Sequence, residues 1–229
     1  MREEAKSDVY DAAHATAEAY NVPVEQSFYY PMFRKVVDEV RARRPSSVLE
    51  VGCGSGGLAD LLTRRRDVTY RGFDFSPVAV RNASQRYPDI GDFFVGDALD
   101  PISYTQPYDL VVCTEVLEHI TRDLDVVSMW RPGTDCVCSV PNFDYPTHVR
   151  HFRHEDEVMQ RYSPLIDITA ISRVAKPVLV GKTWRQYFRQ LRWAREQPTR
   201  VLGLLGINSF DWYAGWFVFA GKRRDVTTG

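Results

Sequence analysis

A strand, a glycine-rich turn and a helix follow one another at residues 47–65, and this unit constrains the fold more than any other part of the chain. "SVLEVG" has the length and apolar content of a buried strand. "GLADLLTRR" carries its apolar residues at helical spacing. Between them "CGSG" supplies glycines, which tolerate the backbone angles of a sharp turn. Such a unit is typical of α/β proteins with a parallel sheet.

Apolar strands and helices keep alternating after this unit. Strands that are apolar on both sides and separated by helices are typical of a parallel sheet covered on both faces. We therefore expect a doubly wound, mostly parallel, Rossmann-like α/β sheet with a helical N-terminal extension. The expected strands are residues 69–76, 92–99, 108–115, 134–142, 165–174 and 212–224, and the expected helices are residues 8–20, 31–44, 57–65, 77–87, most of 115–130, and 183–197.

The composition is that of a globular protein in a reducing compartment. The 229 residues carry a net charge of -1, which offers no electrostatic reason to expect a nucleic-acid partner. No apolar run has the length of a membrane span, and the first residues lack a signal-peptide pattern. The cysteines, of which three fall in expected strands, form no C-x-x-C pair, so we expect buried thiols and a cytoplasmic protein. The four cysteines are Cys53, Cys113, Cys136 and Cys138.

The glycine turn fits two ligand patterns at once. Gly52, Gly54 and Gly57 match G-x-G-x-x-G, the loop that binds dinucleotides such as NAD. Glu50, Gly52, Gly54 and Gly56 match E-x-G-x-G-x-G, the loop that binds S-adenosylmethionine. A carboxylate at residue 50 is unfavourable beside a pyrophosphate and favourable beside the ammonium group of a methionine moiety. Residue 50 therefore favours the second ligand.

Two further acids end neighbouring strands. Asp74 ends the second expected strand of the sheet, where a carboxylate can bind both ribose hydroxyls. Asp97 follows the third strand, where it can accept from an adenine amine while Ala98 offers its backbone N–H.

These blocks, in this order, resemble the class I S-adenosylmethionine-dependent methyltransferases. The blocks are "VLEVGCGSGGL", "GFDFS", "GDAL" and "YDLVVCTEVLEHI". The resemblance runs from residue 48 to 141 and implies a seven-stranded sheet whose last strand is antiparallel. It also implies one domain over 1–229, with a helical cap (1–46), a cofactor-binding core (47–142) and a substrate-side region (143–229). Carried over to this chain, the cofactor site comprises Glu50, Gly52, Gly54, Gly56, Asp74, Phe75, Asp97, Ala98 and Glu115.

A second constellation follows the fourth strand of the core. In "EVLEHI", Glu115, Glu118 and His119 stand at i, i+3 and i+4, on one face if the segment is helical. The segment is similar to that of small-molecule O-methyltransferases of the ubiquinone-pathway type. It is also similar to that of small-RNA 2′-O-methyltransferases, in which the two glutamates, this histidine and a later one bind a divalent ion. His148 falls where the later histidine would come.

This constellation supports three interpretations. Glu115, Glu118, His119 and His148 hold a divalent ion such as Mg²⁺, Mn²⁺ or Zn²⁺; or His119 or His148 is a metal-free catalytic base; or these residues are structural. We expect methyl transfer to a hydroxyl of a small-molecule metabolite. RNA 2′-O-methylation and cofactor binding without catalysis are the alternatives.

Three other segments are candidates for the substrate side. Phe28, Tyr29 and Tyr30 form either a substrate lid or part of the core, and Tyr10 is a candidate cofactor contact. Residues 183–197 fit a core-facing helix with a solvated basic face better than a lid or a membrane-surface helix. The apolar stripe of this helix comprises Trp184, Tyr187, Phe188 and Leu191, and its arginines are Arg185, Arg189, Arg192 and Arg195. The arginines suggest an acidic acceptor. The aromatic residues of the last third fit a homodimer.

Overall fold

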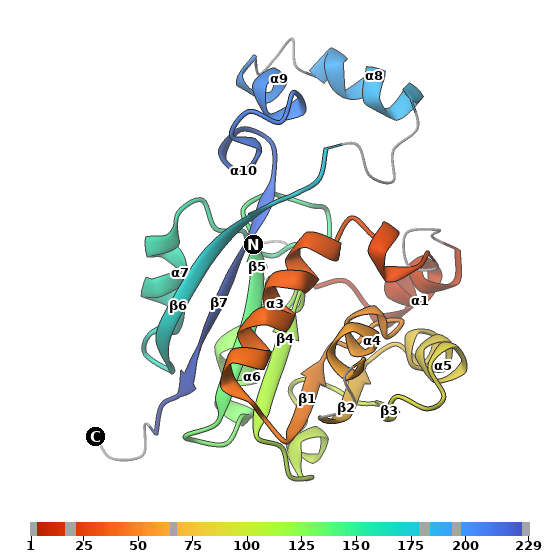
Figure 1. Cartoon of the computed structure of the whole chain (residues 1–229), viewed down its shortest axis with the longest axis vertical. Helices are drawn as coiled ribbons and strands as arrows, with labels where there is room; N and C mark the ends of the chain where they lie inside the picture. The colour runs from red at the N-terminus through yellow and green to blue at the C-terminus, as the bar shows by residue number, and fades with distance from the viewer. Residues whose placement is uncertain (1–3, 17–21, 65–67, 179–183, 194–197, 226–229) are drawn as a thin grey trace.

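The computed structural model describes residues 4–16, 22–64, 68–178, 184–193 and 198–225. Its strands form one sheet with helices on both sides (Figure 1). The strands are β1 (Ser47–Val51), β2 (Thr69–Asp74), β3 (Asp92–Val95), β4 (Leu110–Thr114), β5 (Asp135–Pro141), β6 (Ile166–Ala175) and β7 (Gly215–Arg223). The helices are α1 (Ser7–Thr16), α3 (Tyr30–Arg43), α4 (Gly57–Thr63), α5 (Pro77–Arg86), α6 (Asp123–Met129), α7 (Glu155–Tyr162), α8 (Trp184–Trp193), α9 (Thr199–Leu204) and α10 (Ser209–Trp212), with short 3-10 turns η1 (Val24–Gln26) and η2 (Pro101–Tyr104).

The sheet has seven strands in the order β3-β2-β1-β4-β5-β7-β6. The pairs that join β1 through β5 are parallel, whereas β7 is antiparallel to both β5 and β6. The expected fold class is therefore confirmed. The chain leaves β1 toward β2 on one side, and β4 lies on the other, so the strand order reverses between β1 and β4. Ligands of open α/β sheets bind at such a switch point, beyond the carboxyl ends of the strands.

Apolar residues alternate between the two faces of the sheet. Val48 faces the helices α3 and α4, whereas Leu49 and Val51 face α6 and α7. On the first side, Met32, Val36 and Leu58 are almost fully buried. On the second side the core holds Trp130, Tyr162 and Phe219, the last two as stacked rings. Burial on both faces gives the sheet its stability and leaves the strand ends for function.

The four cysteines are free and buried, as expected. Among the described residues, no helix is long and apolar enough to cross a membrane.

The segment from residue 115 to 122 differs from the expected helix. Only Asp123–Met129 is helical, and the preceding residues form turns. Glu115 takes a left-handed backbone angle, φ +56°, which a continuous helix does not allow. The carbonyl groups of Leu117, Ile120 and Thr121 accept hydrogen bonds from the Arg150 guanidinium instead of from helical N–H groups. The proposed i, i+3, i+4 face was therefore wrong.

Other boundaries differ less. The strand expected at 92–99 ends at Val95, because Asp97 starts a side-chain turn in which its Oδ1 accepts from Leu99 N at 2.8 Å. Parts of the helices expected at 8–20, 57–65 and 183–197 lie outside the described residues.

Candidate active site

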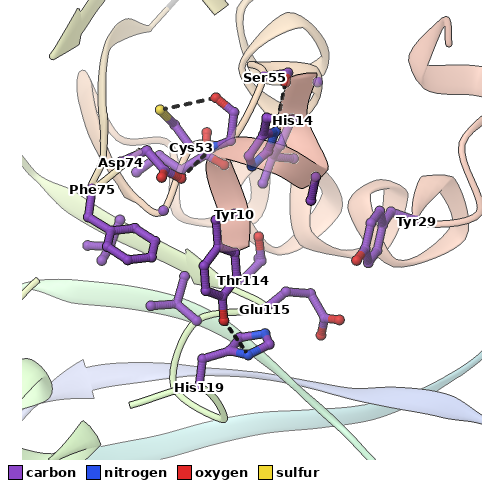
Figure 2. A pocket seen from close by; sticks show the side chains of 18 of the residues that line it. Tyr10, His14, Tyr29, Cys53, Ser55, Asp74, Phe75, Thr114, Glu115 and His119 are labelled. Carbon is purple, nitrogen blue, oxygen red and sulfur yellow. Dashed lines mark hydrogen bonds between the residues drawn. The ribbon is translucent and has the colours of Figure 1, made fainter. Parts of the chain in front are cut away.

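A cavity of about 590 Å³ opens at the carboxyl ends of β1, β2 and β4. Its walls include the glycine loop and Asp74, the turn after β3, the β4–α6 turn, and residues of α1 (Figure 2). The cavity therefore lies at the switch point that the strand order predicts.

The glycine loop makes close approaches that no larger residue would allow. Gly52, Gly54 and Gly56 all have positive φ angles. A Cβ on Gly52 would stand 2.2 Å from Cγ2 of Val116, so a side chain there would collide with the β4–α6 turn. The loop thus presents bare backbone to the cavity, which suits a ligand that the main chain must cradle.

Asp74 organises this loop. Its Oδ2 accepts from Gly54 N at 3.0 Å, and its Oδ1 accepts from Ser76 N at 2.9 Å. Burial raises the pKa of the carboxyl, while these two hydrogen bonds act in the opposite direction. Each carboxylate oxygen retains a further acceptor position, so Asp74 can hold the loop and two ribose hydroxyls together.

Helix α1 covers the loop and adds residues that the sequence did not single out. The His14 ring is buried, its Nδ1 lies 3.1 Å from Ser55 Oγ, and its Cε1 lies 3.5 Å from the Cβ position of Gly54. Asp11 accepts from the hydroxyl of Ser76. His14 lies one helical turn beyond Tyr10, and that spacing is the only signal in the sequence that could have placed it.

The adenine side of the site is more open. Phe75 is half-exposed, and its ring meets that of Tyr10 edge to face, with 5.0 Å between centroids. Asp97 is exposed, whereas Ala98 is buried. Phe75, Asp97 and Ala98 line the cavity, together with Leu99. An adenine ring can therefore contact an aromatic side chain and a carboxylate here.

Glu50 lies beneath the loop. It is almost fully buried and accepts a 2.6 Å hydrogen bond from the Tyr70 hydroxyl. Burial raises the pKa of Glu50 to about 8; the Tyr70 hydrogen bond lowers it, and the charge of Asp74 raises it further. An ammonium group nearby would stabilise the ionised carboxylate, which agrees with the role expected for Glu50.

Glu50→Gln is expected to stabilise the protein at high pH. A carboxyl whose pKa is near 4.5 unfolded and about 8 folded contributes stability at low pH that is lost as the pH rises through about 8. The loss amounts to about 3–5 kcal/mol, and glutamine removes it. The gap in melting temperature between variant and wild type should therefore widen from pH 5 to pH 9. Equal gaps would contradict the raised pKa. Tyr70→Phe is the matched control. It removes the hydrogen bond that lowers the pKa of Glu50, so the stability of this variant should fall more with rising pH than that of the wild type.

The turn after β4 is held rigidly. Arg150, which binds three carbonyl groups of this turn, also makes an ion pair with the fully buried Asp123 at 3.3 Å. Val149 N donates to Glu118 O at 2.8 Å. The turn is thus fastened to the segment that follows β5, which carries His148.

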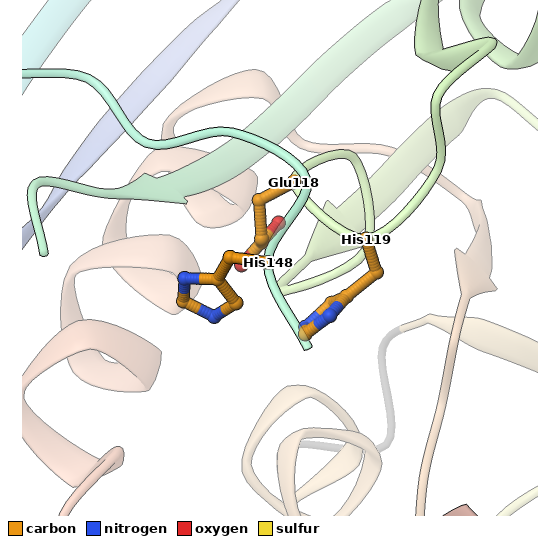
Figure 3. A group of neighbouring side chains, drawn as sticks. All are labelled: Glu118, His119 and His148. Carbon is orange, nitrogen blue, oxygen red and sulfur yellow. The ribbon is translucent and has the colours of Figure 1, made fainter. Parts of the chain in front are cut away.

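Glu118, His119 and His148 come together at this junction (Figure 3). One ligand atom from each lies within 4.8 Å of the others. Both carboxylate oxygens of Glu118 are buried and make no hydrogen bond within the described part of the chain. A buried carboxylate without donors beside two imidazoles fits a bound cation. Glu115, the fourth expected ligand, is not within this group, although its Oε1 is also buried and without a hydrogen bond to the described residues.

Backbone carbonyl groups fix which nitrogen of each imidazole carries the hydrogen. His119 Nδ1 lies 3.0 Å from Thr147 O and 2.9 Å from Tyr10 Oη. A carbonyl only accepts, so Nδ1 carries the hydrogen and Nε2 has the free electron pair. His148 Nδ1 lies 3.2 Å from Phe143 O, which assigns the same tautomer. Burial lowers the pKa of His119, and burial with the charge of His119 lowers that of His148 to about 4.

Aromatic residues and one cation form the far side of the cavity. Phe28 and Tyr29 line it, as a lid would, and also pack against the core around Trp216. Lys176, which the sequence did not single out, has its Nζ 4.3 Å from the ring centroid of Phe143 and 5.0 Å from that of Phe28. Burial raises the pKa of Glu115 to about 7, and the charge of Lys176 opposes this shift. His151 and His154, which follow His148 in the sequence, do not belong to the metal-ligand group.

Residues 26–201 match a family model described as a methyltransferase domain. The chain therefore belongs to the methyltransferase-domain family, and the resemblance to class I S-adenosylmethionine-dependent methyltransferases is confirmed. The cofactor of that class is S-adenosylmethionine. The glycine cradle, Asp74 and Glu50 fit it.

Known proteins of this kind act on different acceptors. The chain is 33% identical over 103 residues to a ubiquinone biosynthesis O-methyltransferase of Escherichia coli O127:H6, covering 42% of each chain. It is 25% identical over 206 residues to the small RNA 2′-O-methyltransferase of Arabidopsis thaliana, covering 80% of this chain and 20% of that one. The N-methyltransferase NodS of Bradyrhizobium japonicum has the same fold, with a TM-score of 0.63 at 16% identity over 94% of this chain and 97% of that one. The chain spans less than half the length of the first curated relatives that it matches.

Proposed function

We propose that this protein transfers a methyl group from S-adenosylmethionine to a hydroxyl group of a small-molecule acceptor. The observation that carries the proposal is His119 in the cavity wall, whose Nδ1 contacts Thr147 O and Tyr10 Oη, so that Nε2 is the basic nitrogen of the ring. A neutral imidazole in that position suits proton abstraction from a hydroxyl. An amine acceptor in its neutral form needs no such base, so the arrangement favours oxygen.

The reaction requires alignment and one proton transfer. When bound, S-adenosylmethionine supplies a methyl group on a positively charged sulfur, which is already a good leaving group. The acceptor oxygen forms a bond to the methyl carbon, the carbon–sulfur bond breaks with its electrons on sulfur, and the hydroxyl proton passes to His119 Nε2. The loop at Gly52 and Gly54 and the carboxylate of Asp74 would hold the donor in line with the acceptor.

The same residues support a second form of deprotonation. Glu118, His119 and His148 offer one carboxylate and two imidazoles close together, which suit a divalent ion with open positions. An ion held there would lower the pKa of a bound hydroxyl. Chelator sensitivity distinguishes the two forms.

The lining favours an acceptor with an aromatic ring and an acidic group. Phe28, Tyr29, Phe143 and Tyr145 offer ring faces, and Lys176 offers a positive charge at the same wall. The acidic acceptor suggested by the arginines at 183–197 would thus have its counter-charge in the cavity at Lys176.

The test is an acceptor panel with a radiolabelled methyl donor. We expect label in phenols and catechols that carry a carboxylate, and little in matched amines. A second candidate is an RNA 2′-hydroxyl, which the similarity over 80% of the chain to the Arabidopsis protein supports; short RNA therefore belongs in the panel. Label in amines alone would contradict hydroxyl transfer. Tight binding of S-adenosylhomocysteine without turnover on any acceptor would favour the alternative that the protein binds the cofactor but catalyses no reaction.

A further inference from the structure

The described helices of the chain between β6 and β7 lie apart from the sheet. Figure 1 shows α8, α9 and α10 beyond the ends of β6 and β7. Trp216 at the start of β7 pairs with Pro141 at the end of β5, so the segment leaves the sheet at the carboxyl ends of the parallel strands. This is the edge at which the cavity opens. We call residues 176–214 the insert.

The insert exposes large apolar side chains. Trp184 and Phe188 of α8 are 76% and 60% exposed, and their ring centroids lie 6.3 Å apart. Leu205 and Ile207, after α9, are 65% and 52% exposed. The expectation that the stripe of α8 faces the core was therefore wrong for Trp184 and Phe188. Its helical periodicity shows that the residues share a face, but periodicity does not tell what covers that face.

The charge of the insert is strongly positive. It carries seven lysines and arginines and two acids, in a chain whose net charge is -1. Arg185 and Arg192 of α8 and Arg200 of α9 are exposed. On α8 the two arginines stand one position beyond Trp184 and Leu191, so they flank the apolar stripe. When such a stripe lies at the acyl boundary of a bilayer, flanking arginines reach the phosphate groups.

We propose that the insert docks on the surface of an anionic lipid bilayer. Aromatic and aliphatic side chains exposed together with flanking arginines suit lipid, because acyl chains accept both kinds of apolar group. The basic residues match the negative headgroups of an anionic leaflet. Docking at this edge of the sheet places the mouth of the cavity near the bilayer. The proposal does not depend on which acceptor is methylated.

The experiment is sedimentation of the full chain with phosphatidylcholine vesicles, with and without phosphatidylglycerol. We expect pelleting with the anionic vesicles, little with the neutral ones, and release at high salt. Arg185→Gln/Arg192→Gln should lower the partition coefficient by about thirtyfold, and Trp184→Ser/Phe188→Ser by about tenfold or more. Ile102→Ser is the matched control, since Ile102 is 74% exposed outside the insert; it should bind as the wild type does.

Four results would overturn the proposal. The wild type could stay in the supernatant with every vesicle, or the control could lose as much binding as the insert variants. A dimer in the wild type that becomes a monomer in Trp184→Ser/Phe188→Ser would assign the patch to a second copy of the chain. Salt-sensitive binding of single-stranded RNA without vesicle binding would assign it to nucleic acid. Unchanged melting temperature and S-adenosylhomocysteine affinity in the variants show that they are folded.

Discussion

Asp74→Ala is expected to weaken binding of S-adenosylhomocysteine by about two to four orders of magnitude. The carboxylate holds Gly54 N and Ser76 N and would also hold the ribose hydroxyls. Two charge-assisted hydrogen bonds to the ligand contribute about 1.5–3 kcal/mol each, and the loop loses its anchor as well. Calorimetric titration measures the change.

Asp109→Ala is the matched control for this variant. Asp109 Oδ2 also accepts from two backbone N–H groups, those of Ser46 and Ser47, but at the opposite edge of the sheet. The control should lose some stability and keep its affinity. Wild-type affinity in Asp74→Ala would show that Asp74 holds the loop alone and does not contact the ligand. Titration with NAD belongs in the same series, because tight NAD binding would contradict the interpretation of Glu50.

His119→Gln is expected to lower kcat by about a hundredfold to ten-thousandfold, the range for loss of a general base. Glutamine retains hydrogen bonding toward Thr147 and Tyr10 but has no basic nitrogen. Affinity for S-adenosylhomocysteine and the melting temperature should change little. His154→Gln is the matched control, because His154 is exposed at the start of α7 and does not belong to the metal-ligand group. Turnover that persists in His119→Gln would exclude both forms of the proposed deprotonation.

Glu118→Gln distinguishes deprotonation by His119 alone from deprotonation assisted by a divalent ion. If an ion assists, the wild type shows a Mn²⁺ or Zn²⁺ isotherm that Glu118→Gln lacks, and a chelator stops turnover. If His119 acts alone, turnover survives the chelator.

The sequence placed the residues expected to bind the cofactor together at one edge of the sheet. The glycine loop and Asp97 each follow a strand, Asp74 ends one, and the carboxyl ends of neighbouring parallel strands meet at one edge. The place of a residue at the end of a parallel strand in the sequence therefore gives its place in the fold. The seven-stranded order with a reversed β7 was expected from the resemblance and is confirmed.

The acceptor half could not be predicted in this way. Glu118, His119 and His148 meet because Arg150 and Val149 bind the β4–α6 turn, not because the first two share a helix face. His14 and Lys176 come from distant segments, and the sequence analysis singled out neither of them.

The sequence by itself determined the alternation of strands and helices, the glycine turn and the class of ligand, because these depend on periodicity and on residues close together in the chain. Only the tertiary structure decided the tautomer of His119, the left-handed turn at Glu115 and the exposure of Trp184 and Phe188. Each of these depends on what a side chain meets after folding. The amphipathic pattern of α8 is the same whether its apolar face meets the core or the outside, and only the position of the insert beyond the sheet separates the two.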